Sequence, residues 1–210
     1  MLTARERLLL NQIRGNSYLH LFALVEEFIL PYALDHARDG VHDDKVRVRA
    51  LATFAEEEAK HQQLFQAFGE EFARVFPVVP RIIGPAKVVS DKVLAYGRLG
   101  VALLVLHLEW LTQHHYVESV KSDVSIDPLF ASLLKHHWQE ESQHAKVDTL
   151  IIGELAALSS AQAIERGFDD FLAMSGFLDE ALQQQVDFDL LALQAAVERD
   201  FEPEQLEAIR

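Results

Sequence analysis

The stretch LATFAEEEAKHQQLFQAF, residues 51–68, places two polar side chains within an apolar helical face. Its positions 51, 54, 58, 61, 65 and 68 follow alternating steps of three and four residues, the spacing of one buried face of an α-helix. Leucine or phenylalanine fills four of these positions, whereas Glu58 and His61 fill the other two. Because an unpaired carboxylate is costly to bury, this interruption indicates a functional site in a helical core.

A second Glu-x-x-His pair, Glu141 and His144, lies on another stripe of the same kind. That stripe consists of Phe130, Leu134, His137, Glu141, His144, Asp148 and Ile151. In each pair the carboxylate and the imidazole are three residues apart, so both lie on one helical face. We expect both pairs to point into the same core.

One glutamate on the preceding predicted helix accompanies each pair. Glu27 lies 31 residues before Glu58, and Glu109 lies 32 residues before Glu141. The similar separations indicate a weak internal repeat. Together the two halves would supply four carboxylates and two imidazoles.

The assignment of Glu27 depends on the phase of the first helix, where it shares a face with His20, Leu24 and Leu34. A kink at Pro31 would shift that phase by one residue and favour Glu26 instead. On the assigned phases Glu26, Glu57 and Glu140 point about 100° away from the core face, so we expect them to be solvated.

Scarce glycines and prolines divide the chain into long predicted helices. We expect helices over residues 3–36, 43–76, 90–120, 128–158 and 159–201, the last interrupted near Ser175-Gly176. The proline-rich segment 77–89 fits a crossover connection. The sequence therefore predicts an all-α fold, a ferritin-type four-helix bundle of two helical hairpins over residues 3–158. C-terminal helices over 159–210 complete a single domain, 1–210, and pack on the bundle or on a second subunit as a homodimer.

One glutamate from each of two helices, with Glu-x-x-His from each of the other two, resembles the ligand set of the ferritin-like di-iron carboxylate superfamily. The resemblance implies two iron ions, or manganese or a mixed pair, bound by Glu27, Glu58, His61, Glu109, Glu141 and His144. It places Glu58 and Glu141 best to bridge the metals. It also implies O₂, an electron donor and a small organic substrate, which we expect near Phe54, Phe65, Trp110 and Trp138.

His137 narrows this resemblance. The order His137-x-x-x-Glu141-x-x-His144 puts three potential ligands on one face and is similar to the p-aminobenzoate N-oxygenase branch, in which an extra histidine joins one metal. That branch implies an O₂-dependent oxygenase or oxidase. The other interpretation of His137 is a core histidine hydrogen-bonded to a carboxylate.

Composition excludes several other functions. The 33 acidic and 19 basic residues give a net charge of −14, which disfavours nucleic acid and an anionic membrane surface. The absence of cysteine excludes disulfides, iron–sulfur clusters and thiolate zinc sites. No uninterrupted apolar run approaches about 18 residues and no signal-peptide core is visible, so we expect a cytoplasmic protein with no membrane partner.

Two further classes remain open at this point. The same ligands would serve a ferritin-like iron oxidation and storage protein or a manganese catalase, since residue types alone do not select iron over manganese. A third class is a metal-free helical interaction protein. Metal content separates it from the first two.

Overall fold

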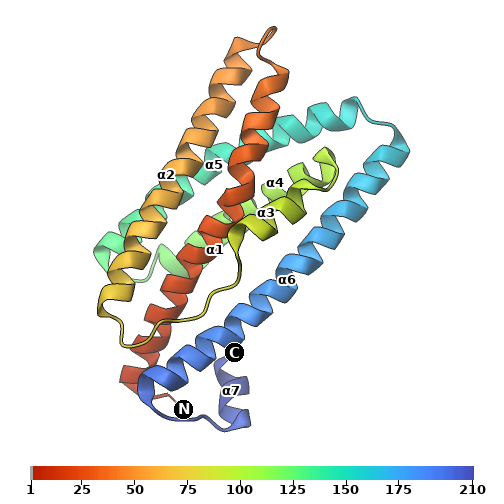
Figure 1. Cartoon of the computed structure of the whole chain (residues 1–210). Helices are drawn as coiled ribbons and strands as arrows, with labels where there is room; N and C mark the ends of the chain where they lie inside the picture. Colours follow the sequence, from red (N-terminus) through yellow and green to blue (C-terminus); the bar gives the residue numbers. More distant parts are fainter. Residues whose placement is uncertain (1) are drawn as a thin grey trace.

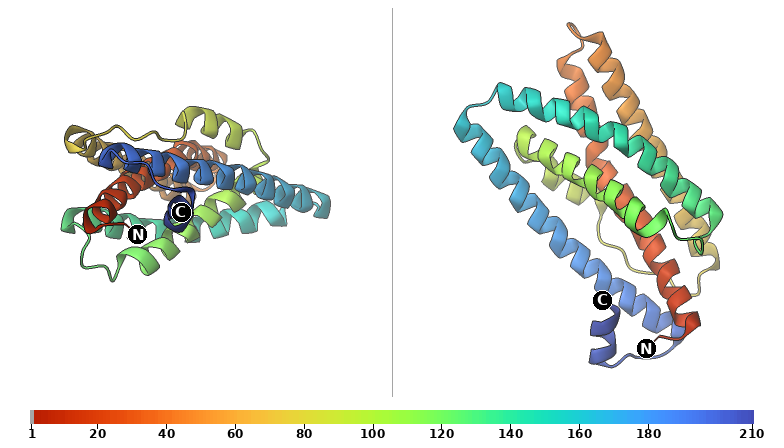
Figure 2. Two further views of the ribbon diagram at one scale, coloured as in Figure 1. Left: turned by 90° about the horizontal axis from the view of Figure 1, so that it is seen from below. Right: turned by 180° about the vertical axis from the view of Figure 1, so that it is seen from behind.

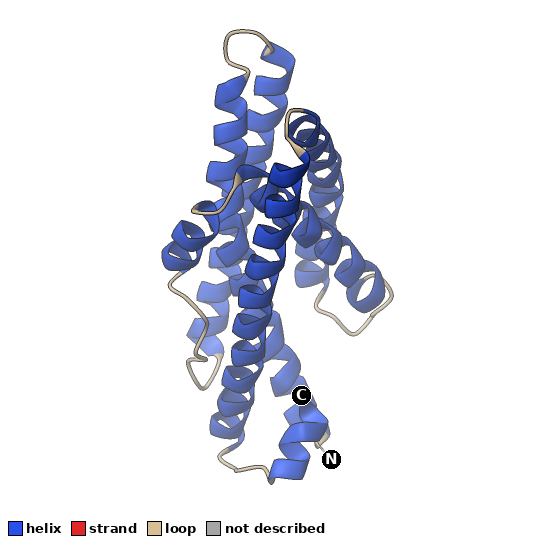
Figure 3. Cartoon of the chain, turned by 90° about the vertical axis from the view of Figure 1, so that its right-hand side faces the viewer, coloured by secondary structure: helices blue, strands red, loops and turns tan. Residues whose placement is uncertain are grey.

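The computed structural model describes residues 2–210, and all regular secondary structure in that range is helical (Figures 1 and 3). The elements are α1 (Ala4–Asp39), α2 (Lys45–Val75), α3 (Ala86–Leu94), α4 (Arg98–His115), a π-helical segment (Tyr116–Val120), α5 (Pro128–Ala157), α6 (Ala161–Val197) and α7 (Pro203–Ile209). The all-α prediction is therefore confirmed.

Helices α1 and α2 form a long antiparallel hairpin (Figure 1). Thr3 caps α1 by accepting from the Glu6 amide, and the Glu6 side chain accepts from the Thr3 amide in return. Asp44 caps α2 by accepting from the amides of Val46 and Arg47. These caps satisfy amides that have no partner within their helices, and they explain why both starts could be predicted.

Helices α4 and α5 form the second hairpin, and α4 also packs against α6 (Figure 2). Pro128 occupies the first turn of α5, where the sequence predicts a helix to begin, and Asp127 caps it. The expectation of one continuous helix over 90–120 is wrong, because the chain breaks between α3 and α4. At that break the Gly97 amide donates to Asp170 of α6, and a Cβ on Gly97 would lie 2.9 Å from the Asp170 carboxylate.

Helix α6 runs unbroken through Ser175-Gly176, so the predicted interruption there is also wrong. Its C-terminal half is fastened to α1 by buried hydrogen bonds. Ser17 and Gln185 both donate to Asp189 Oδ1, at 2.6 and 2.9 Å. Gln185 also accepts from the Ile83 amide in the connection between α2 and α3. Asp189 is therefore buried although it is acidic.

Helix α1 is buried on two faces. One face consists of Leu19, Phe22, Glu26, Ile29, Ala33 and His36. The other includes Leu10 and Ile13, which pack with Leu193 of α6. Among the described residues, α1 is long and apolar enough, by length and composition only, to cross a membrane. Because α1 is buried on two faces, an apolar composition is expected for it as a core helix.

Candidate metal centre

Seven buried side chains from α1, α2, α4 and α5 form two adjoining groups. The first, position A, consists of Glu26, His61, His137 and Glu141. The second, position B, consists of Glu58, Glu109, Glu141 and His144. In each group the potential ligand atoms lie within 4.8 Å of one another, and each of the seven residues is 4% exposed or less.

Glu141 belongs to both positions, and its two oxygens face different partners. Oε1 lies 3.3 Å from His61 Nδ1 and 3.0 Å from His137 Nε2, in position A. Oε2 lies 3.5 Å from His144 Nδ1, in position B. This placement would allow Glu141 to bridge two metal ions. Glu58, which the resemblance also offered as a bridge, belongs to position B alone.

The remaining distances define each group. In position A, Glu26 Oε1 lies 3.2 Å from His137 Nε2 and 3.5 Å from His61 Nδ1. In position B, His144 Nδ1 lies 2.9 Å from Glu58 Oε1 and 4.0 Å from Glu109 Oε1.

The donor atoms fit metal ions because most of them lack any other partner. Buried atoms without a hydrogen-bond partner among residues 2–210 include one oxygen of Glu26, both oxygens of Glu58 and of Glu109, Oε1 of Glu141, and Nδ1 of His61 and His144. Unpaired buried polar atoms are costly, so their convergence fits a site that binds a ligand. Two divalent ions would balance the charge of the four carboxylates and accept the free lone pairs.

Two further carboxylates orient the histidines across the hairpins. His61 Nε2 of α2 donates to Glu140 of α5 at 2.6 Å, and His144 Nε2 of α5 donates to Glu57 of α2 at 2.9 Å. With Nε2 donating to these carboxylates, each ring in its neutral form presents the lone pair of Nδ1 to the centre.

Glu57 and Glu140 therefore act on the site, and the expectation that they are solvated is wrong. Both side chains are only about one quarter exposed, at 26% and 25%. The signal that could have identified them is their shared position, because each immediately precedes a ligand glutamate in a Glu-Glu-x-x-His sequence.

Burial and crowding shift the titration of these groups. The pKa of Glu58 is raised to about 8, chiefly by burial and then by the neighbouring Glu141 carboxylate. Burial also raises the pKa values of Glu26 and Glu109 well above the ordinary value. The next largest cause is the Glu58 carboxylate for Glu26 and the Glu141 carboxylate for Glu109. Burial lowers the pKa of His61 to about 4. Burial also acts to lower the pKa of His144, but the adjacent carboxylates of Glu141 and Glu58 outweigh it and raise that pKa to about 11.

A buried tyrosine and aspartate adjoin position B. Tyr32 of α1 donates to Asp148 Oδ1 of α5 at 3.1 Å, and the other Asp148 oxygen has no hydrogen-bond partner among the described residues. Burial raises the pKa of Asp148 to about 7. The sequence placed Asp148 on the core stripe but gave it no role.

The structure brings together six of the seven predicted ligands and excludes Glu27. Glu27 is exposed, and Glu26 takes its place in position A. The alignment with Glu109 selected the wrong face because α1 has two buried faces. The predicted bundle face was the stripe through His20, Leu24 and Leu34, but the stripe through Phe22, Glu26 and Ile29 faces the centre.

His137 joins the centre, but in position A rather than beside His144. Its ring also packs against Phe22 and Phe65, with ring centroids 4.6 and 5.1 Å apart respectively. Contacts with Glu26 and Glu141 account for its burial among aromatic rings.

A pocket of about 310 Å³ reaches position A between α2 and α5. Its lining includes His61 and His137, the apolar Leu64, Phe68, Leu129 and Leu133, and the polar Lys60, Ser132, His136 and Glu140. Lys60 Nζ contacts both oxygens of Glu140 at 2.6 Å. Of the four residues near which the sequence predicts a substrate, Phe54 and Phe65 are fully buried, and neither Trp110 nor Trp138 lines this pocket.

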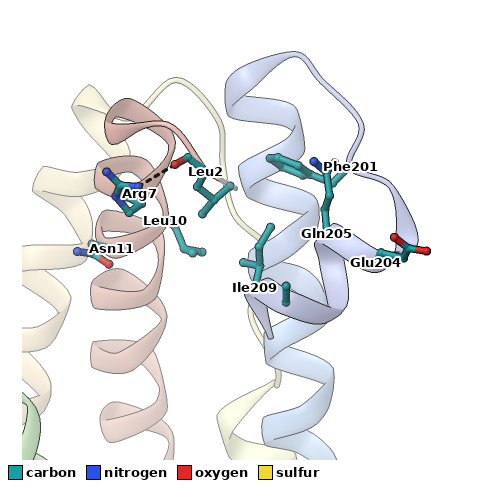
Figure 4. Close-up of a pocket in the computed structure, with 9 residues that line it drawn as sticks. Leu2, Arg7, Leu10, Asn11, Phe201, Glu204, Gln205 and Ile209 are labelled. Atoms are coloured by element: carbon teal, nitrogen blue, oxygen red, sulfur yellow. Dashed lines mark hydrogen bonds between the residues drawn. The ribbon is translucent and has the colours of Figure 1, made fainter.

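A second cavity, of about 620 Å³, lies between the start of α1 and α7 (Figure 4). Leu2, Leu10, Phe201 and Ile209 line it, together with polar groups that include Arg7 and Glu204. Position A lies about 24 Å further along α1, judged from the helical rise between Leu10 and Glu26. This cavity is therefore separate from the metal centre.

No family model matches the chain, and no match is found among curated proteins or solved structures. The helical fold and the buried Glu/His groups therefore carry the functional argument.

Proposed function

We propose that the protein is a di-iron oxygenase or oxidase that acts on a small, mainly apolar organic molecule. The observation that carries this proposal is the pair of buried Glu/His groups that share Glu141, with its two oxygens facing opposite groups. Two redox-active ions at these positions would supply the binding and reduction of O₂. Manganese or a mixed pair would fit the same donors.

The chain's own residues would each have a defined task. Glu26, His61 and His137 would hold one ion, Glu58, Glu109 and His144 the other, and Glu141 would bridge them. Glu140 and Glu57 would fix the ring orientation of His61 and His144. Phe54 excludes water from position B, because its ring stacks on His144 with centroids 3.8 Å apart.

The pocket at position A favours an organic substrate over iron storage or peroxide removal. Its volume of about 310 Å³ lies at the small end of the usual range for ligand pockets. Leucine and phenylalanine form much of its wall, and its main cation, Lys60, is neutralised by Glu140. These features favour a small molecule with little net charge.

The proposed function includes the finer description of the fold. The α1–α2 and α4–α5 hairpins would be the two halves of a ferritin-type bundle, joined by the segment that contains α3. The weak repeat of Glu-Glu-x-x-His in α2 and α5 supports this arrangement, because equivalent helices supply equivalent ligands.

Elemental analysis followed by an O₂-uptake assay tests the proposal. The purified chain should bind close to two ions of iron, and the ferrous protein should consume O₂ in a single turnover. A Glu109→Ala variant should lose metal and O₂ uptake together, whereas a Glu118→Ala variant, at an exposed position just beyond α4, should retain both. Absence of bound metal, with the same melting curve with and without chelator, would refute the proposal.

A further inference from the structure

The two positions present different donor sets. Position A offers two imidazoles and two carboxylates, counting the shared Glu141, whereas position B offers one imidazole and three carboxylates. Each additional carboxylate adds a full negative charge next to the cation. Position B should therefore attract a hard divalent ion such as Mn²⁺ more strongly.

The surroundings of the two positions also favour tighter retention of an ion at position B than at position A. Position B is closed by Phe54 stacked on His144, and its Glu58 and Glu109 side chains are 0% and 1% exposed. Position A forms part of a pocket wall, where His61 and His137 line the space between α2 and α5. A chelator, a small ligand or a substrate therefore has a route to position A.

The supporting carboxylates are also unequal. Glu140, which orients His61 in position A, is paired with Lys60. Glu57, which orients His144 in position B, has no such cation among its hydrogen bonds and ion pairs within residues 2–210. The Lys60 charge offsets the electron density that Glu140 lends to His61, so it further weakens cation binding at position A.

From these differences we propose that position B retains its ion, while position A is the exchangeable position that faces the substrate through the pocket. The inference rests on the proposed function, since it requires that both positions bind metal. It adds an order of loading and release, and it identifies the ion next to which a substrate would lie.

Chelator extraction of the protein loaded with two Mn²⁺ ions tests this inference. Excess chelator is added, and the remaining Mn²⁺ is measured in desalted samples over time. We expect two phases of one ion each, the first faster by about tenfold or more, as one additional charge in the donor set would give. Loading with a single equivalent of Mn²⁺ should yield only the slow phase.

Two ligand variants assign the phases. His137→Ala should accelerate or abolish the fast phase and leave the slow phase unchanged. Glu109→Ala should remove the slow phase. If His137→Ala accelerates the slow phase instead, the assignment is wrong.

A pocket variant with a matched control tests the route. Leu129 lines the pocket and Leu150 does not, and both lie on α5 with side chains 69% and 75% exposed. Leu129→Trp should slow the fast phase severalfold, whereas Leu150→Trp should leave both phases unchanged. A fast phase that is the same in both variants would overturn the proposed route.

Two results separate this inference from the proposed function. Release of both ions in a single phase would overturn the proposed difference in ion retention between positions A and B, but it would leave the two-metal site intact. Failure to load Mn²⁺ at all, with no other divalent ion bound, would refute the metal centre itself, and this inference with it.

Discussion

At the scale of single residues, the neighbouring glutamates 26 and 27 provide a controlled comparison. Glu26 lies in position A and is 2% exposed, whereas the adjacent Glu27 is exposed to solvent. We expect Glu26→Ala to reduce bound metal from two ions to one, and Glu27→Ala to retain both. Elemental analysis of the two purified variants measures this directly.

The opposite pattern, with metal lost only from the Glu27 variant, would return the ligand to the face predicted from sequence. Circular dichroism of both variants verifies that α1 remains folded in each.

The assignment of Glu27 in place of Glu26 shows which features of a helix its sequence pattern can and cannot predict. Helix α2 has one apolar stripe, so the phase of Glu58 and His61 was unambiguous. Helix α1 has two, and only the positions of α2 and α6 reveal which face meets the centre. A position on an amphipathic helix is predictable from its own sequence, but a choice between two buried faces depends on tertiary contacts.

At the scale of helices, α2 and α5 each supply a carboxylate that orients a histidine of the other helix. Glu57 of α2 accepts from His144, and Glu140 of α5 accepts from His61. Removing one supporting carboxylate charge should lower metal affinity about 10–100-fold, the usual range for such partners. We expect this loss for Glu140→Gln at position A and for Glu57→Gln at position B. Isothermal titration with Mn²⁺ measures each affinity.

A control is available one residue before Glu57. Glu56 is exposed and contacts neither position, so Glu56→Gln should leave both affinities unchanged. Equal affinities in all three variants would mean that the two hydrogen bonds do not support the metal centre.

The attachment of α6 to α1 depends on a buried polar cluster. Asp189 Oδ1 accepts from both Ser17 and Gln185, so Asp189→Ala leaves two buried donors without this partner. We expect the free energy of unfolding to fall by about 1–3 kcal/mol, the usual cost of an unsatisfied buried group. Denaturant unfolding measures the loss.

Asp187→Ala is the matched control, because Asp187 is on the same helix and its carboxylate is half exposed, where it pairs with Arg210. If Asp187→Ala lowers the free energy of unfolding as much as Asp189→Ala does, the buried hydrogen bonds of Asp189 do not contribute more to stability than the exposed ion pair.

Some helix boundaries are determined by residues nearby in the sequence, and others by contacts with residues far away in the sequence. The starts of α2 and α5 were predictable because Asp44 and Asp127 cap them within three residues. The break before α4 was not, since Gly97 bonds to Asp170, 73 residues away. Gly176 suggested an interruption, yet nothing lies within 4 Å of where its Cβ would be, and α6 continues through it.

At the scale of the whole molecule, burying four carboxylates makes stability depend jointly on pH and metal. In the metal-free fold the pKa of Glu58 is about 8 against an ordinary 4.5, that of Asp148 is about 7 against 3.8, and that of His144 is about 11 against 6.5. The folded chain therefore holds protons that the unfolded chain releases. The stability that these protons provide is lost as pH rises through the folded pKa values.

We accordingly expect the melting temperature of the metal-free protein to fall by several degrees between pH 6 and pH 9. Metal reverses this trend, because bound ions replace the protons and require ionised carboxylates and a neutral His144. The metal-loaded protein should melt higher than the metal-free protein at every pH in this range, with the gap widest at pH 9. Thermal melts with and without chelator measure both curves. If the melting temperatures with and without metal change in parallel with pH, the buried carboxylates do not exchange protons for metal. The raised pKa values would then not reflect a cation-binding centre.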